Sequence, residues 1–191
     1  LDRAIGDVLA RVDLASTYVV YFGDNGTPDD ARPEGTPTGF WKGTTHEGGV
    51  RVPMIVAGPG IVPGQSERLV SALDIPATLF ELLGRSSRGF EDSRSFADEL
   101  GPWWVGAPPR DFVFTEQYEP STYEDRAIIA RDWKLRVWDP DGPLGPLPVK
   151  ESIYRVRRDL KANRPLDPAD PRLIGLATFL RVRLNSLPPR L

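Results

Sequence analysis

Two neighbouring oxygen-bearing side chains and a lysine are the residues near the N-terminus whose types and spacing could do chemistry. Asp24 and Asn25 follow the apolar run Tyr18–Phe22, and Lys42 comes seventeen residues after Asn25 in a glycine-rich turn. Carboxylate and amide oxygens suit Ca²⁺ or Mg²⁺ better than a soft metal, and a lone cation can neutralise an oxyanion. Ligands in open α/β sheets collect at the carboxyl ends of strands. The spacing therefore predicts half of a site for an anionic ester bound to a divalent cation.

Each of these signals is weak when it is taken alone. Asp-Asn-Gly is also typical of an Asx turn that ends a strand, and most lysines are simply solvated. Glycines at positions 43, 48 and 49 strengthen the second signal, because they let the backbone approach a ligand closely. The combination, rather than any single residue, indicates a binding site.

The composition fits one or two ordinary globular units and argues against several functions. The chain has 191 residues, of which 40% are hydrophobic and 27% are charged. Its net charge of -3 argues against a general nucleic-acid surface, and no apolar run approaches the roughly 20 residues that cross a bilayer. The absence of cysteine excludes disulfides, thiolate metal sites and a cysteine nucleophile. It leaves periplasmic, secreted and cytoplasmic locations open.

Residues 1–100 are expected to form a first domain of the α/β class. The predicted order is a helix over 1–12, a central parallel strand Thr17–Phe22, a loop Gly26–Phe40, a strand Arg51–Ala57 and a helix Ser71–Leu83. Asp74 is predicted to cap the second helix and Gly84 to end it. Helix, strand, loop, strand, helix is the rhythm of a doubly wound layer.

Residues 101–191 are expected to form a small C-terminal α+β subdomain. The predicted strands are Asp111–Gln117, Ala127–Ala130, Trp133–Trp138 and Ser152–Val156. Arg131 and Asp132 form the predicted turn between the second and third strands, and a helix is predicted to start at Asp170. The pattern indicates an antiparallel sheet with a terminal helix.

Three segments resemble the motifs of a known family, and they follow one another in the same order and at the same spacing as in that family. They read KGTTHEGGVRVP from Lys42, IVAGPG from Ile55 and SALDIPATLFELLG from Ser71. The chain resembles the second half of a sulfatase, a member of the alkaline phosphatase superfamily. The likeness is close over Thr17–Gly84 and loose over Arg126–Val137. It implies part of a doubly wound sulfatase-type α/β domain followed by the small antiparallel subdomain.

The resemblance also implies roles for individual residues. Asp24 and Asn25 would ligate Ca²⁺, with Mg²⁺ less favoured, and Lys42 would contact the sulfate group. His46 is expected as a second substrate contact, although a turn residue packed beside Glu47 is the alternative interpretation. The expected partner is a sulfated small molecule or glycan. The oligomeric state is left open.

One departure from the family pattern concerns the nucleophile. Sulfatases use a formylglycine made from the Cys or Ser of a Cys/Ser-x-Pro-Ser-Arg segment, which lies far upstream of the Asp-Asn-Gly strand. Only 23 residues precede Asp24 here, and the partial match Ser186–Arg190 lies at the wrong end of the chain. The chain is therefore expected to be a C-terminal part, inactive by itself, that contributes metal ligands and Lys42. A phosphate or phosphonate monoester hydrolase and a non-catalytic remnant are the alternatives.

Glu47 and Arg51 also match the family pattern and are interpreted as structural. They are expected to hold the turn that aims Lys42.

Overall fold

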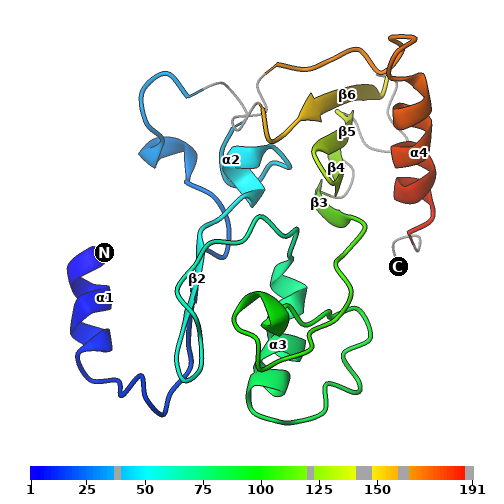
Figure 1. The fold of residues 1–191 in the computed structure, drawn as a ribbon. Coiled ribbons are helices and arrows are strands. Elements are labelled where there is room, and N and C mark those ends of the chain that lie inside the picture. The colour runs from blue at the N-terminus through cyan, green and yellow to red at the C-terminus, as the bar shows by residue number, and fades with distance from the viewer. Residues whose placement is uncertain (37–39, 120–122, 141–147, 159–163, 188–191) are drawn as a thin grey trace. The chain divides into compact units, whose positions relative to one another are not determined.

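The computed structural model describes residues 1–36, 40–119, 123–140, 148–158 and 164–187 (Figure 1). The chain divides into two compact units, and each is discontinuous in the sequence. Unit 1 comprises residues 1–23 and 53–110, and unit 2 comprises residues 24–52 and 111–191. The predicted domain boundary between residues 100 and 101 stays a prediction. None of the described helices combines the length and the hydropathy that crossing a membrane requires.

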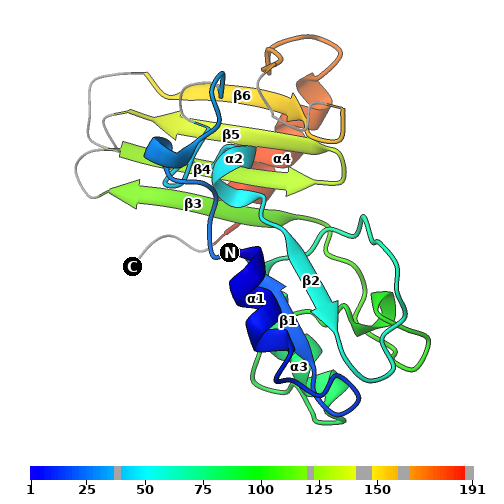
Figure 2. The same cartoon turned by 90° about the vertical axis from the view of Figure 1, so that its left-hand side faces the viewer.

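Unit 1 contains one pair of strands rather than a layer of parallel strands in its described residues. Its elements are α1 (Asp2–Leu9), β1 (Val19–Phe22), β2 (Met54–Ala57) and α3 (Ile75–Leu82). β1 and β2 run antiparallel, with Val19 opposite Ala57 and Phe22 opposite Met54 (Figure 2). The prediction of a parallel strand over Thr17–Phe22 is therefore wrong. An apolar run indicates that a strand packs on both faces, but it does not encode the direction of the neighbouring strand.

The start of α3 also differs from the expectation. A 3₁₀ turn at Ala72–Asp74 precedes the helix, and Asp74 does not cap α3 with its side chain. Ser71 lies one turn earlier and caps the 3₁₀ turn, while the Asp74 carboxylate accepts a hydrogen bond from the Ser71 backbone N at 2.9 Å. The predicted end is confirmed, because Gly84 has a φ of 65° and closes the helix.

Unit 2 is built on a four-stranded antiparallel sheet, which confirms the predicted sheet and terminal helix. Its strands follow the chain in the order β3 (Val113–Glu119), β4 (Tyr123–Ala130), β5 (Trp133–Asp139) and β6 (Lys150–Arg155). Arg131 has a φ of 52° in the tight turn between β4 and β5, as the predicted turn requires. Helix α4 (Ile174–Asn185) completes the unit, and it begins at Ile174 rather than at the predicted Asp170.

Different elements of unit 2 pack on the two faces of this sheet (Figure 2). Alternate side chains of a strand point to opposite faces, so Ile128, Leu135 and Ile153 pack against Leu180 of α4. The opposite face carries Tyr154 and is covered by the N-terminal part of unit 2, including the short helix α2 (Glu47–Val50). The sheet therefore lies between the terminal helix and the segment that contains Lys42.

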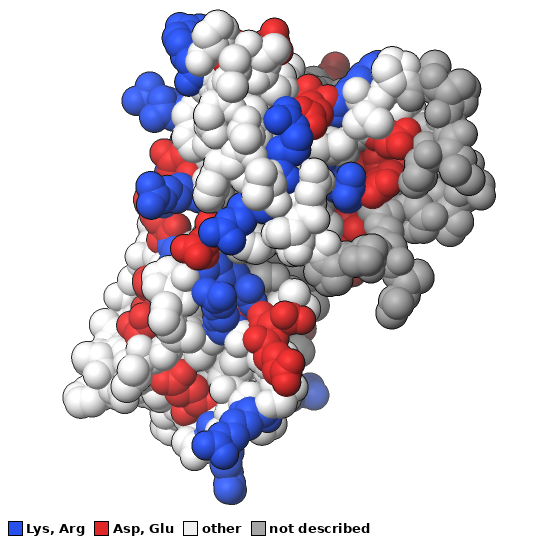
Figure 3. Space-filling view, turned by 90° about the vertical axis from the view of Figure 1, so that its right-hand side faces the viewer, with Lys and Arg blue, Asp and Glu red and all other residues white. Residues whose placement is uncertain are grey.

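Charged side chains on the face shown in Figure 3 are mixed in sign. Lys and Arg alternate with Asp and Glu on this face rather than gathering into one basic patch. This distribution agrees with the net charge of -3.

Candidate functional site

Asp24 and Asn25, here called the oxygen pair, begin unit 2 shortly after β1 ends. The Asp24 side chain is exposed and that of Asn25 is partly buried. Asp24 Oδ1 accepts a hydrogen bond from the backbone N of the next residue, Asn25, at 2.9 Å. Both side chains offer hard oxygen donors, so their chemistry fits Ca²⁺ or Mg²⁺. No cluster of three or more His, Cys, Asp and Glu suited to a metal occurs in the described ranges.

The backbone after the oxygen pair lies beside residues 41–50, here called the Lys42 turn. Gly26 N donates to Gly49 O at 2.8 Å, and Lys42 N donates to Thr27 O at 2.9 Å. A Cβ atom at Gly26 would overlap the carbonyl oxygen of Gly48, so this close approach requires glycine. The Lys42 side chain itself is exposed. The structure thus brings together two segments that residues 28–40 separate in the sequence.

Thr45 fixes the buried part of the Lys42 turn to strand β4. Its backbone N and its Oγ1 donate to the two carboxylate oxygens of Asp125, at 2.9 and 2.7 Å. Arg136 of β5 approaches the same carboxylate, with Nε 2.8 Å from Oδ1. Both Thr45 and Asp125 are buried. Hydrogen bonds to an ionised acceptor are the stronger kind, so Asp125 is an effective anchor for the turn.

Glu47 fixes the Lys42 turn to strand β5. Its Oε1 lies 2.8 Å from Nζ of Lys134, whose side chain is 0% exposed. Burial lowers the pKa of the Lys134 ammonium, and the charge of Glu47 and the hydrogen bond to it oppose that shift. Arg51 lies farther away, with its Nη1 at 4.0 Å from the second carboxylate oxygen. Of the two residues expected to hold the turn, Glu47 therefore binds the sheet through Lys134, whereas Arg51 only approaches Glu47 at a longer distance.

Sequence reasoning missed Asp125, Lys134 and Arg136, the three charged residues of the sheet that anchor the turn. Lys134 and Arg136 occupy alternate positions of β5, opposite in face to the core residue Leu135. That alternation is the ordinary signature of a strand with one solvated face. The only available signal was the loose family likeness over residues 126–137, which contains two of them.

His46 lies in a buried aromatic stack. Its ring is stacked on Phe40 at 4.1 Å between centroids, and Tyr154 meets it edge-on at 6.0 Å. The side chain is 8% exposed, and Nδ1 has no hydrogen-bond partner among the described residues. Burial, with the charges of Arg136 and Lys134, lowers the pKa of His46 to about 4, while Asp125 opposes the shift. His46 is therefore neutral at pH 7, and its predicted contact with substrate stays a prediction.

The lowered pKa of His46 predicts a loss of stability in acid. The unfolded chain binds a proton near pH 6.5, whereas the folded chain resists protonation until about pH 4. The stabilising contribution is thus fully present above pH 6.5 and is lost as pH falls towards 4. Between pH 7 and 4.5, the free energy of unfolding should fall by about 2 kcal/mol more for the wild type than for His46→Phe. Urea titrations of both proteins measure the difference, and parallel pH profiles would contradict it.

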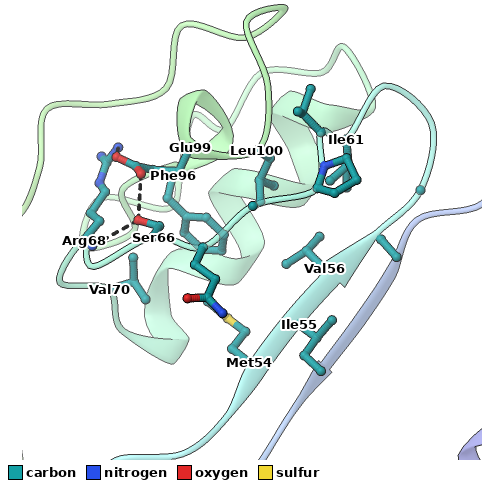
Figure 4. A pocket seen from close by; sticks show the side chains of 16 residues that line it. Met54, Ile55, Val56, Ile61, Ser66, Arg68, Val70, Phe96, Glu99 and Leu100 are labelled. Carbon is teal, nitrogen blue, oxygen red and sulfur yellow. Dashed lines mark hydrogen bonds and ion pairs between the residues drawn. The ribbon is translucent and has the colours of Figure 1, made fainter.

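Unit 1 holds a separate pocket of about 740 Å³, whose lining includes neither the oxygen pair nor Lys42. Figure 4 shows the apolar side chains of Val56, Phe96 and Leu100 around it. Three of its polar side chains engage one another, because Glu99 accepts a hydrogen bond from Ser66 at 2.6 Å and lies 3.7 Å from Arg68. This pocket is not part of the candidate site.

Comparison with known proteins gives a consistent family assignment. Residues 1–85 match the family model described as Sulfatase. Arylsulfatase A of Homo sapiens is 38% identical over 92 residues, which are 44% of this chain and 18% of that protein. Choline-sulfatase of Rhizobium meliloti (strain 1021) is 34% identical over 142 residues, which are 70% of this chain and 26% of that protein. Steryl-sulfatase of Rattus norvegicus is 39% identical over 99 residues, covering 44% of this chain and 17% of that protein.

The chain thus spans between 17% and 26% of the length of these three relatives. The matched residues 1–85 contain both the oxygen pair and the Lys42 turn. The match to choline-sulfatase covers more of the chain than the family model does. The chain belongs to the sulfatase family.

Proposed function

We propose that the full-length protein containing this chain hydrolyses sulfate esters of a small molecule or glycan. The observation that carries the proposal is the pairing of Gly26 with Gly49 and of Lys42 with Thr27. These hydrogen bonds set a cation-bearing turn beside two hard oxygen donors in a chain of the sulfatase family. Such an arrangement suits an ester whose acid group is an anion.

Each residue of the site has a distinct role in this proposal. Asp24 and Asn25 would hold Ca²⁺, with Mg²⁺ less favoured, and the bound cation would offset negative charge on the sulfate group. Lys42 would bring its ammonium to the non-bridging sulfate oxygens and stabilise the charge that grows as the ester bond breaks. The nucleophile would be a formylglycine, which we place outside these 191 residues.

The reaction class is tested with the full-length protein and three matched esters. We expect turnover of an aryl sulfate in the presence of millimolar Ca²⁺, and a much lower kcat/KM for the corresponding aryl phosphate and phosphonate. Preference for the phosphate or phosphonate would instead favour the related monoesterase activity. No turnover of any of the three would contradict the proposed hydrolysis and favour a remnant without catalysis.

The 191-residue chain tested alone is expected to be inactive and to bind Ca²⁺ weakly. Asp24 and Asn25 offer two ligands, whereas Ca²⁺ takes 6 to 8 oxygens, so water would fill the remaining places. Isothermal titration with Ca²⁺ should give a Kd in the millimolar range or weaker, on the order of the weakest natural sites. Robust hydrolysis of an aryl sulfate by this chain would show that its catalytic centre is complete.

A further inference from the structure

The four-stranded sheet holds the Lys42 turn through contacts with two of its strands. Thr45 and Glu47 flank His46, and each bonds to a different strand. Asp125 on β4 receives two hydrogen bonds from Thr45, and Lys134 on β5 meets Glu47. The partners lie 80 and 87 residues apart in the sequence. The turn therefore takes its position from strands that follow it much later in the chain.

We propose that Asp125 and Lys134 are positioning residues that hold the Lys42 turn in register with the oxygen pair. They do not touch the proposed substrate, and they act through Thr45 and Glu47. The role of Lys42 in this inference rests on the proposed function. The mechanical coupling between the sheet and the turn stands independently of it.

The route from the sheet to the oxygen pair is short and continuous. Glu47 opens the single helical turn α2, which ends at Val50 and includes Gly49. Gly49 O accepts the hydrogen bond of Gly26 N, the residue next to the oxygen pair. At the other end of the turn, Lys42 N is bonded to Thr27 O. A shift of α2 on the sheet would therefore change the position of Lys42 relative to the residues after Asn25.

The charges of this anchor are arranged so that the loss of one partner has a large effect. Lys134 is fully buried, and Glu47 is its close counter-charge. An unpaired buried charge is much less favourable than a neutral side chain of the same shape. Methionine at position 134 would keep most of the volume, but it would leave Glu47 without its ammonium partner. Valine at position 45 is the milder change, because it removes one of the two hydrogen bonds to Asp125.

A double-mutant cycle measured by kinetics in the full-length protein distinguishes a positioning role from a general loss of structure. Lys134→Met should lower kcat by about 10²-fold, as expected for a misplaced catalytic group. In the Lys42→Ala background the same change should cause no further loss, because no ammonium remains to be positioned. Thr45→Val should show the same pattern with a smaller loss and serves as the variant least disruptive to folding. Equal losses in both backgrounds would overturn the positioning role.

Hydrogen exchange provides a readout that does not depend on activity. In the full-length protein, Thr45→Val should make amide exchange in residues 24–30 and 41–50 about tenfold faster, the factor expected for losing one hydrogen bond to a charged group. Exchange in α4 should not change. The matched control is Arg181→Met, which breaks the pair between Arg181 and Glu151 on the opposite face of the sheet. This control should leave residues 41–50 as protected as in the wild type.

The two readouts distinguish failure of the inference from failure of the proposed function. Unchanged exchange in residues 41–50, or equal acceleration throughout unit 2, would overturn the inference even if the enzyme hydrolyses sulfate esters. If no ester is hydrolysed but exchange accelerates only around the Lys42 turn, the coupling is supported and the proposed function fails.

Discussion

Lys42→Ala is expected to lower kcat/KM for sulfate ester hydrolysis by the full-length protein by about 10²–10³-fold, as for the loss of one charge-stabilising donor. The physical reason is that the ammonium neutralises charge that is larger in the transition state than in the bound ester. The exposed side chain extends from a backbone held in place by the hydrogen bond from Lys42 N to Thr27 O. Truncation at Cβ should therefore remove a charge without disturbing the turn.

The measurement is steady-state kinetics on an aryl sulfate, with Lys150→Ala as the matched control. Lys150 is also an exposed lysine of unit 2, but it lies on β6 with its ammonium 5.3 Å from the ring centre of Trp138. Its loss should leave kcat/KM within about twofold of the wild type, as for surface changes away from special features. An unchanged rate for Lys42→Ala would remove Lys42 from the mechanism.

Asp74→Ala is expected to be the most destabilising single change in unit 1, with a loss of about 3–5 kcal/mol in the free energy of unfolding. Asp74 is 1% exposed, and its carboxylate accepts hydrogen bonds from the backbone N of Ser71 and of Arg94. Arg110 binds the same carboxylate through Nε at 2.8 Å and also donates to Asp92 O. Removal would leave a mostly buried guanidinium with Asp92 O as its remaining acceptor, and it would leave two backbone N–H groups without one.

Urea unfolding of the 191-residue chain measures this loss, and Asp74→Asn separates the effects of charge and shape. The matched control is Asp170→Ala, because Asp170 also pairs with an arginine, Arg172, but at the surface. Exposed ion pairs contribute little, so the control should unfold at nearly the same urea concentration as the wild type. A similar midpoint for the Asp74 variants and the control would contradict the buried role of Asp74.

The features that the sequence predicted correctly are those determined by neighbouring residues. Gly84 ends α3 because glycine adopts the positive φ that a helix C-terminus requires. The turn at Arg131 between β4 and β5 is equally local. The reach of the Lys42 ammonium to the Asp24 site stays a prediction, because the hydrogen bond from Lys42 N to Thr27 O places only the backbone.

The features that the sequence did not predict depend on residues far apart. Tyr18–Phe22 contains no information about which way Met54–Ala57 runs beside it, so the parallel direction was wrong. Thr45 and Asp125 are each unremarkable polar residues until the fold brings them within 2.7 Å of one another. A buried lysine at position 134 has the same sequence signature as an exposed one, because only tertiary structure supplies its partner.

The separation of 80 residues between Thr45 and Asp125 has a consequence for how the protein is made. Chains emerge from the ribosome N-terminus first at about 5–20 residues per second, so the Lys42 turn waits roughly 4–16 s for its anchor on β4. Until then Thr45 has no Asp125 and Glu47 has no Lys134 to bond. The arrangement of Lys42 is thus completed only well after its own residues have been synthesised. A stop codon before β4 would keep every residue of the Lys42 turn and remove the strands whose contacts hold the turn in place.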